Sequence, residues 1–121
     1  MISFDYAVLR VVPRVDREEF INAGIILFCL KRDFLQARVH LDPTRLLALC
    51  PGADAEVIAS HLASVPQICM GSGPIGQLAI KERWHWLISP RSTLVQPGPV
   101  HSGLCEDPAV SLEKLMARVV R

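Results

Sequence analysis

The sequence predicts an α+β fold in which a small antiparallel sheet, with three main strands and a short fourth, carries helices packed on one face. Three observations point to this class. Alternating or continuous apolar runs fill the first third of the chain, and apolar residues at helical spacing fill most of the rest. With 121 residues, 50% of them apolar and 21% charged, the chain can also bury one self-supporting core. We therefore expect a single domain over residues 1–121.

The three main strands are predicted in the first third of the chain. Phe4–Val12 is apolar on both faces, as in a central strand, and Pro13 ends it because proline cannot donate a ladder hydrogen bond. Phe20–Leu30 is rich in residues that favour strands, and Gly24 within it indicates a bulge or a close backbone approach. Phe34–Leu41 alternates polar and apolar side chains, and its short polar link to the preceding strand predicts a hairpin.

Three helices are predicted to begin at aspartate residues. Asp42-Pro43 and Asp107-Pro108 each combine an N-cap with a proline at the first helical position. Asp54 caps another helix, in which apolar residues recur at helical spacing and form one inward face. Because an aspartate side chain can accept hydrogen bonds from the free N–H groups of the first turn, these positions fix where each helix starts.

Less regular patterns follow the second of these helices. Pro66 is expected to end or kink it. Ile75–Leu87 favours a helix, although its Trp84–Trp86 part fits a strand equally well. Thr93–Gln96 is predicted as the short fourth strand, and Pro97–Pro99 as a turn that follows it.

Composition and cysteine usage exclude several classes of protein. A formal net charge of +1, from 13 Lys+Arg and 12 Asp+Glu, argues against extended binding to nucleic acid. The longest apolar run, Ala23–Leu30, is far shorter than the about 20 residues of a membrane-spanning helix. The N-terminus lacks a signal-peptide pattern, so we expect a cytoplasmic protein without a membrane partner. The four widely spaced cysteines are expected to be reduced core thiols.

Sequence motifs for catalysis are absent. The chain has no phosphate loop, no zinc-protease or kinase signature and no nucleophile elbow, and its four histidines do not cluster. The sequence therefore leaves enzymatic activity undecided, favours a binding role and implies no cofactor and no metal. Of the two tryptophans, Trp84 and Trp86, we expect at least one in the core, with stacking on a nucleobase as the alternative.

The strongest candidate for binding chemistry is the turn Ser89–Thr93. Arg91 offers a planar fork of donors beside the hydroxyls of Ser92 and Thr93, and this set suits a phosphate or a carboxylate. The alternative is a structural turn, in which the hydroxyls bind nearby backbone groups and the arginine pairs with a surface acid.

Two further polar residues lie among apolar neighbours near the start of the chain. Asn22, two residues before Gly24, either orients the backbone there or presents its amide to a ligand. Arg10 lies within an apolar strand, so its charge must reach solvent, a ligand or a carboxylate, with Glu19 as one candidate. For both residues the structural role and the binding role remain open at the level of sequence.

A set of motifs runs through nearly the whole chain: Tyr6–Arg10, Pro13, Glu19-Phe20-x-Asn22-x-Gly24, Leu27-Phe28, Arg83-Trp84-x-x-Leu87, Ser89–Thr93, Gln96, His101-x-Gly103 and Asp107-Pro108. The set resembles a bacterial family named only as domain of unknown function 3037. The family has no assigned activity, so the resemblance implies no catalytic residues. It implies one candidate partner, a HipA-like kinase that is encoded beside some members.

The sequence supports two hypotheses about function. The first is a small binding or adaptor module whose protein partner is the HipA-like kinase that the resemblance implies. The alternative is an anion-, phosphate- or nucleotide-binding protein whose site is built from Arg91, Ser92, Thr93, Arg83, Arg10 and Asn22. An open cleft at the turn with Arg10, Asn22 or Arg83 nearby favours the alternative, whereas an Arg91 buried against Glu19 or another acid argues against it.

Overall fold

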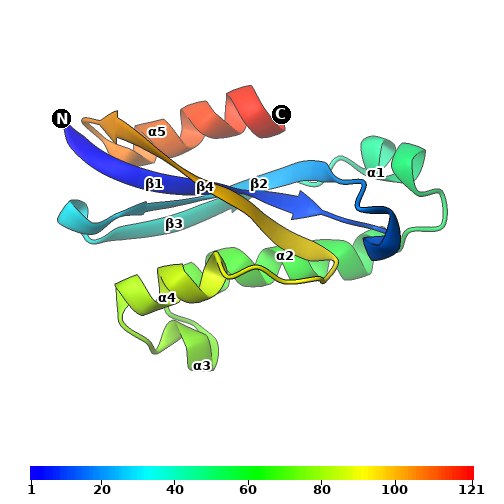
Figure 1. Cartoon of the computed structure of the whole chain (residues 1–121), viewed down its shortest axis with the longest axis horizontal. Coiled ribbons are helices and arrows are strands. Elements are labelled where there is room, and N and C mark those ends of the chain that lie inside the picture. The colour runs from blue at the N-terminus through cyan, green and yellow to red at the C-terminus, as the bar shows by residue number, and fades with distance from the viewer.

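The computed structural model describes residues 1–121 and contains a four-stranded antiparallel sheet with the order β3-β2-β1-β4 (Figure 1). The strands are β1 (Ile2–Val11), β2 (Ile21–Cys29), β3 (Phe34–Val39) and β4 (Val95–Cys105). The helices are α1 (Pro43–Leu49), α2 (Ala55–Cys69), α3 (Gly73–Gly76), α4 (Ile80–Leu87) and α5 (Pro108–Leu115), which continues as the π-helical turn η3 (Met116–Val120). The predicted α+β class and antiparallel sheet are confirmed.

The first three strands agree with the sequence pattern. β1 pairs with β2 on one side and with β4 on the other, so it is the central strand that its two apolar faces predict. β2 and β3 form the expected antiparallel hairpin. None of the helices has both the length and the apolar character that crossing a membrane requires.

Helices cover both faces of the sheet, not the one face expected. Ile26 and Phe28 of β2 pack in the cluster that α2 and α4 complete, whereas Ile25 and Leu27 pack against α5 and η3. Figure 1 accordingly shows α5 above the sheet and α2 and α4 below it. The physical reason is the continuous apolar run of β2, because alternate side chains of a strand point to opposite faces and both sets must be buried.

Gly24 marks both a bulge and a close approach of strands. Leu9 pairs with Gly24 but Arg10 pairs with Asn22, so β2 contains one extra residue at this point. A Cβ atom at Gly24 would lie 2.7 Å from the backbone oxygen of Arg38 in β3, which leaves no room for a side chain. The bulge falls directly beside Arg10, the one charged residue in this part of β1.

β4 differs from the prediction of a short strand followed by a turn. It runs for 11 residues and pairs with β1 along its length, with a register shift between Ala7 and Leu9 of β1. Pro97 and Pro99 lie within it, so the expected turn at Pro97–Pro99 is wrong. The edge position explains this, since an edge strand needs ladder hydrogen bonds on one side only and tolerates residues without an N–H group.

The helix starts are as predicted, whereas one helix end is not. The carboxylates of Asp42, Asp54 and Asp107 each accept a hydrogen bond from backbone N–H groups in the first turn of their helix. Pro66 does not end α2, which continues to Cys69. Since Cys69 is buried in the core between α2 and the sheet, tertiary packing holds this last turn in place. Residues 84–86 are helical within α4.

Candidate functional site

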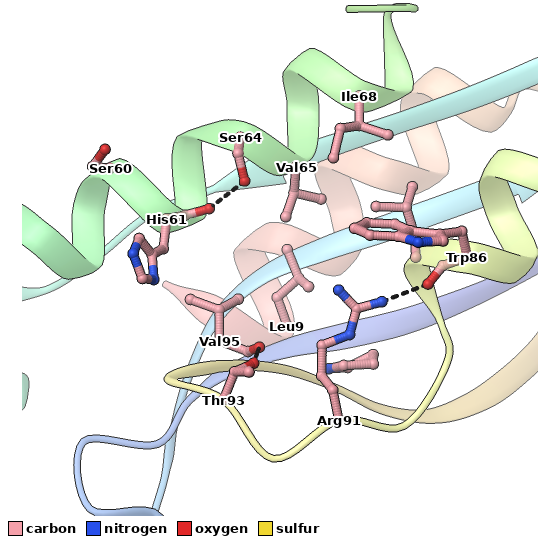
Figure 2. Close-up of a pocket in the computed structure, with 12 residues that line it drawn as sticks. Leu9, Ser60, His61, Ser64, Val65, Ile68, Trp86, Arg91, Thr93 and Val95 are labelled. Atoms are coloured by element: carbon pink, nitrogen blue, oxygen red, sulfur yellow. Dashed lines mark hydrogen bonds between the residues drawn. The ribbon is translucent and has the colours of Figure 1, made fainter. Parts of the chain in front are cut away.

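The turn at Ser89–Thr93 forms one wall of a groove between α2, the end of α4 and β4 (Figure 2). The groove has a volume of about 440 Å³. Its apolar lining comes from Leu9, Val65, Ile68, Leu87, Val95 and Pro97. Its polar lining comes from Ser60, His61, Ser64, Arg91 and Thr93. An apolar surface with a few placed polar groups is typical of a small-molecule site.

Arg91 is held at the wall of the groove by the chain around it. Its Nε donates to the backbone oxygen of Ser89 at 3.2 Å, and its Nη2 donates to the backbone oxygen of Trp86. The guanidinium lies over the Trp86 indole, with Cζ 4.5 Å from a ring centroid. Together these contacts fix the plane of the guanidinium, and Figure 2 shows its other terminal nitrogen directed toward the groove.

The charge of Arg91 is not neutralised by any acid. None of the ion pairs in the protein includes it, so the suggested pairing of Arg91 with a surface acid is wrong. The other part of the structural alternative is confirmed, because the hydroxyls of Ser89 and Thr93 donate to the nearby backbone oxygens of His85 and Val95. Burial lowers the pKa of Arg91 from its usual value, yet a guanidinium remains protonated at neutral pH. A partly desolvated cation with an open side is a good receptor for an anionic ligand group.

Unlike Arg91, which can only donate hydrogen bonds, two hydroxyl groups at the groove are available to a ligand as acceptors. The Ser64 hydroxyl donates to the backbone oxygen of His61 at 2.7 Å, and the Thr93 hydroxyl donates to that of Val95 at 2.8 Å. Their protons are therefore engaged, and their oxygen lone pairs are left to accept from a ligand. The His61 ring lies across the groove from Arg91 (Figure 2).

The structure separates the six residues expected around one phosphate. Arg91 and Thr93 line the groove, but Ser92 and Arg10 line a second cavity. Arg83 donates to the backbone oxygens of Leu78 at 3.0 Å and Cys69 at 2.7 Å, and thus ties the end of α2 to the start of α4.

Asn22 is likewise used within the fold. Its Nδ2 donates to the backbone oxygen of Val119 at 3.3 Å, which anchors η3 to β2. The suggested pair of Arg10 with Glu19 is also wrong, because Glu19 pairs with Arg17 at 2.6 Å. The single six-residue phosphate site of the sequence hypothesis is thus replaced by a groove around Arg91 and a separate cavity around Arg10.

Sequence reasoning missed the contribution of α2 to the groove. Ser60, His61 and Ser64 interrupt the apolar pattern of this helix next to the inward-facing Val65, and that interruption is the signal that could have found them. The sequence also did not show which of the two tryptophans lies outside the core. Trp84 stacks on Phe28 in the core, whereas Trp86 lies at the groove beneath Arg91.

The thiol of Cys69 is not an activated nucleophile. Burial raises the pKa of this thiol to about 12, although the charge of Arg83 acts in the opposite direction. Cys69 is therefore a protonated core thiol at neutral pH. All four cysteines are free thiols, and Cys29, Cys69 and Cys105 are buried, as expected of core residues. No group of three or more His, Cys, Asp or Glu side chains converges in a metal-binding arrangement.

Comparison with known proteins yields one finding. A family model described as "Protein of unknown function (DUF3037)" matches residues 6–120. No curated protein and no solved structure gives a significant match. The matched range contains every residue that lines the groove and the cavity at Arg10. The family description assigns no activity.

Proposed function

The chain belongs to the family of unknown function DUF3037, and from its groove we propose that it is a binding module for a small anionic ligand with a flat apolar body, such as a mononucleotide. One observation carries this proposal. The Arg91 guanidinium, fixed on Trp86 and free of any acid, lines a groove of about 440 Å³ whose surface is otherwise largely apolar. A ligand that supplies the missing negative charge and covers the apolar surface satisfies both features.

The other polar groups of the groove narrow the ligand class. The hydroxyl oxygens of Ser64 and Thr93 can accept hydrogen bonds because their own protons bind the backbone. A matching ligand therefore carries donor groups as well as an acidic group. Mononucleotides combine a phosphate, a flat base and several N–H and O–H donors, which is why they are the first compounds to test.

Binding is tested by the melting temperature of the wild-type protein in the presence of four nucleoside monophosphates and the four matching nucleosides. A ligand at 100 times its Kd stabilises the folded state by about 2.7 kcal/mol. We therefore expect at least one monophosphate to raise the melting temperature by several degrees. The matching nucleoside, which lacks the charge for Arg91, should bind about tenfold more weakly or worse. Equal binding of nucleotide and nucleoside, or no binding by either, would show that the proposal is incorrect.

A second candidate function, a protein-binding adaptor, is supported by the free edge of β4. The stretch Val100–Cys105 has no Asp, Glu, Lys or Arg, and its Val100 and Leu104 are 44% and 65% exposed. Pro97 and Pro99 protect only the first half of this edge against pairing with another strand. In the view of Figure 1, β4 crosses in front of the other strands, and no helix covers it on the side of the viewer. A partner could therefore add a strand here, and the family resemblance suggests a HipA-like kinase as that partner.

The adaptor function is tested with Leu104→Lys, which puts a charge in the exposed edge. We expect this variant to lose association with a HipA-like kinase encoded beside the gene, measured by co-purification, because a charged edge disfavours strand addition. Val110→Lys on α5 is the matched control, since Val110 is also an exposed apolar residue but lies on a helix. Unchanged association of Leu104→Lys, or none of the wild-type protein, would contradict docking of this kinase at β4.

A further inference from the structure

The Arg10 side chain has no hydrogen-bond or ion-pair partner in the protein. The guanidinium forms no ion pair, and its Nε is buried without any hydrogen-bond acceptor. It is the one buried side-chain nitrogen or oxygen in the protein that lacks a partner. Leaving a buried donor of a charged group unsatisfied is costly, so such groups commonly mark a place where something else binds.

The guanidinium of Arg10 is nevertheless held in a defined position. On one side its Cζ lies 4.2 Å from the centroid of the Phe20 ring. It also lies close to Gly98 of β4, where an added Cβ would lie only 3.1 Å from both Cζ and Nε of Arg10. The absence of a side chain at Gly98 thus leaves room for the guanidinium beside β4. Phe20 and β4 contact the guanidinium without offering its Nε an acceptor.

The Arg10 side chain lines a cavity of about 300 Å³ that is distinct from the groove at Arg91. Leu9 lines the groove and Arg10 lines this cavity, because successive residues of β1 point to opposite faces of the sheet. The cavity is also lined by Ser92 and Gln96. The Gln96 amide uses one N–H for the backbone oxygen of Thr93 and has a second N–H available.

We propose that Arg10, Ser92 and Gln96 form a second site, which binds an oxyanion, either a phosphate or a carboxylate group. The guanidinium fork can donate two parallel hydrogen bonds to two oxygens of such a group, and the neighbouring hydroxyl and amide add further donors. Glu18 is the one acid that lines the cavity, and it forms no ion pair with Arg10. Its negative charge weakens anion binding but does not occupy the fork.

The test uses the Nε–H signals of arginine in an NMR titration of the wild-type protein with inorganic phosphate and, separately, with sodium acetate. We expect the Arg10 signal to shift and saturate with at least one of the two anions, and the stronger response tells phosphate from carboxylate. Arg32, which forms no hydrogen bond or ion pair through its side chain, is the internal reference and should not saturate. The proposed site is ruled out if the Arg10 signal does not shift, or if the signals of Arg10 and Arg32 shift together without saturation.

Variants of the cavity lining separate this site from the groove. Ser92→Ala should weaken anion binding severalfold, and Glu18→Gln should strengthen it severalfold by removing a like charge. Gly98→Ala should weaken it, because the new methyl group would lie 3.1 Å from Cζ and Nε of Arg10 and shift the guanidinium. Arg91→Ala should leave the Arg10 response unchanged even if the groove binds no ligand at all. Loss of that response in Arg91→Ala, or no effect of Ser92→Ala and Glu18→Gln, would show that no separate site exists.

Discussion

Arg91→Ala is expected to weaken mononucleotide binding by about 10- to 100-fold, because hydrogen bonds to charged groups contribute about 1.5–3 kcal/mol. Arg91 supplies the one guanidinium of the groove and has no acid as an internal partner. Its contacts to the fold are the backbone oxygen of Ser89 in the turn, that of Trp86 in the last turn of α4 and the face of the Trp86 indole. The loss of stability should therefore be small, about 1 kcal/mol. Titration calorimetry measures the affinity, and urea unfolding measures the stability.

Two further variants make the interpretation of this result specific. Arg32→Ala removes an exposed arginine outside the groove and should leave binding unchanged, which controls for the loss of one positive charge. Arg91→Lys keeps the charge but loses the planar fork, so its affinity should fall between those of the wild type and Arg91→Ala. An Arg91→Ala protein that binds as tightly as the wild type would rule out Arg91 as the anion receptor.

Trp84→Ala should produce the largest loss of stability, about 3–5 kcal/mol, as is typical when a large buried aromatic side chain is removed. Trp84 is 3% exposed and stacks on Phe28 of β2, with ring centroids 5.4 Å apart. This contact fixes α4 on the sheet, and α4 carries Trp86 and leads into the Arg91 turn. The expected result is a large decrease in the urea midpoint together with weaker ligand binding.

Trp86→Ala is the matched comparison for Trp84→Ala. Trp86 is 38% exposed, so its removal should lower the unfolding free energy by about 1 kcal/mol or less. It should still weaken ligand binding, because the indole supports the Arg91 guanidinium and contributes to the groove wall. Equal losses of stability in the two variants would contradict the division into a core tryptophan and a groove tryptophan.

Features fixed by local interactions could be predicted from the sequence. The caps at Asp42, Asp54 and Asp107 depend on a side chain and the first turn beside it, so the sequence contains all the information needed. The strands β1 to β3 follow from the pattern of apolar residues. The bulge at Gly24 follows from the one residue without a side chain in a β-rich run.

Features that depend on tertiary pairing could not be predicted in the same way. Pro97 and Pro99 read locally as a turn, and only the position of β4 at the sheet edge allows them within a strand. The placement of helices on two faces depends on where both sets of β2 side chains find partners.

In the candidate site, too, the residue types could be read from the sequence, but their partners in the fold could not. Sequence reasoning singled out the Arg91 turn as a candidate site for an anion, and it also grouped Arg83 and Arg10 there. These three arginines have the same chemistry, and they differ in the acceptors that the fold offers. Arg83 binds the backbone oxygens of Cys69 at the end of α2 and of Leu78 just before α4. Arg91 binds two backbone oxygens and lines the groove, and Arg10 has no acceptor for its Nε.

The most direct test of the central claim is an NMR titration of the wild-type protein with the most stabilising nucleoside monophosphate. The signals to follow are the indole N–H of Trp86 and the Nε–H of Arg91, with the indole N–H of the buried Trp84 as internal comparison. The proposed function predicts that Trp86 and Arg91 shift and saturate with one common Kd, while Trp84 changes little. Shifts confined to residues outside the groove, or no saturation at millimolar ligand, would contradict the assignment of this groove as the binding site.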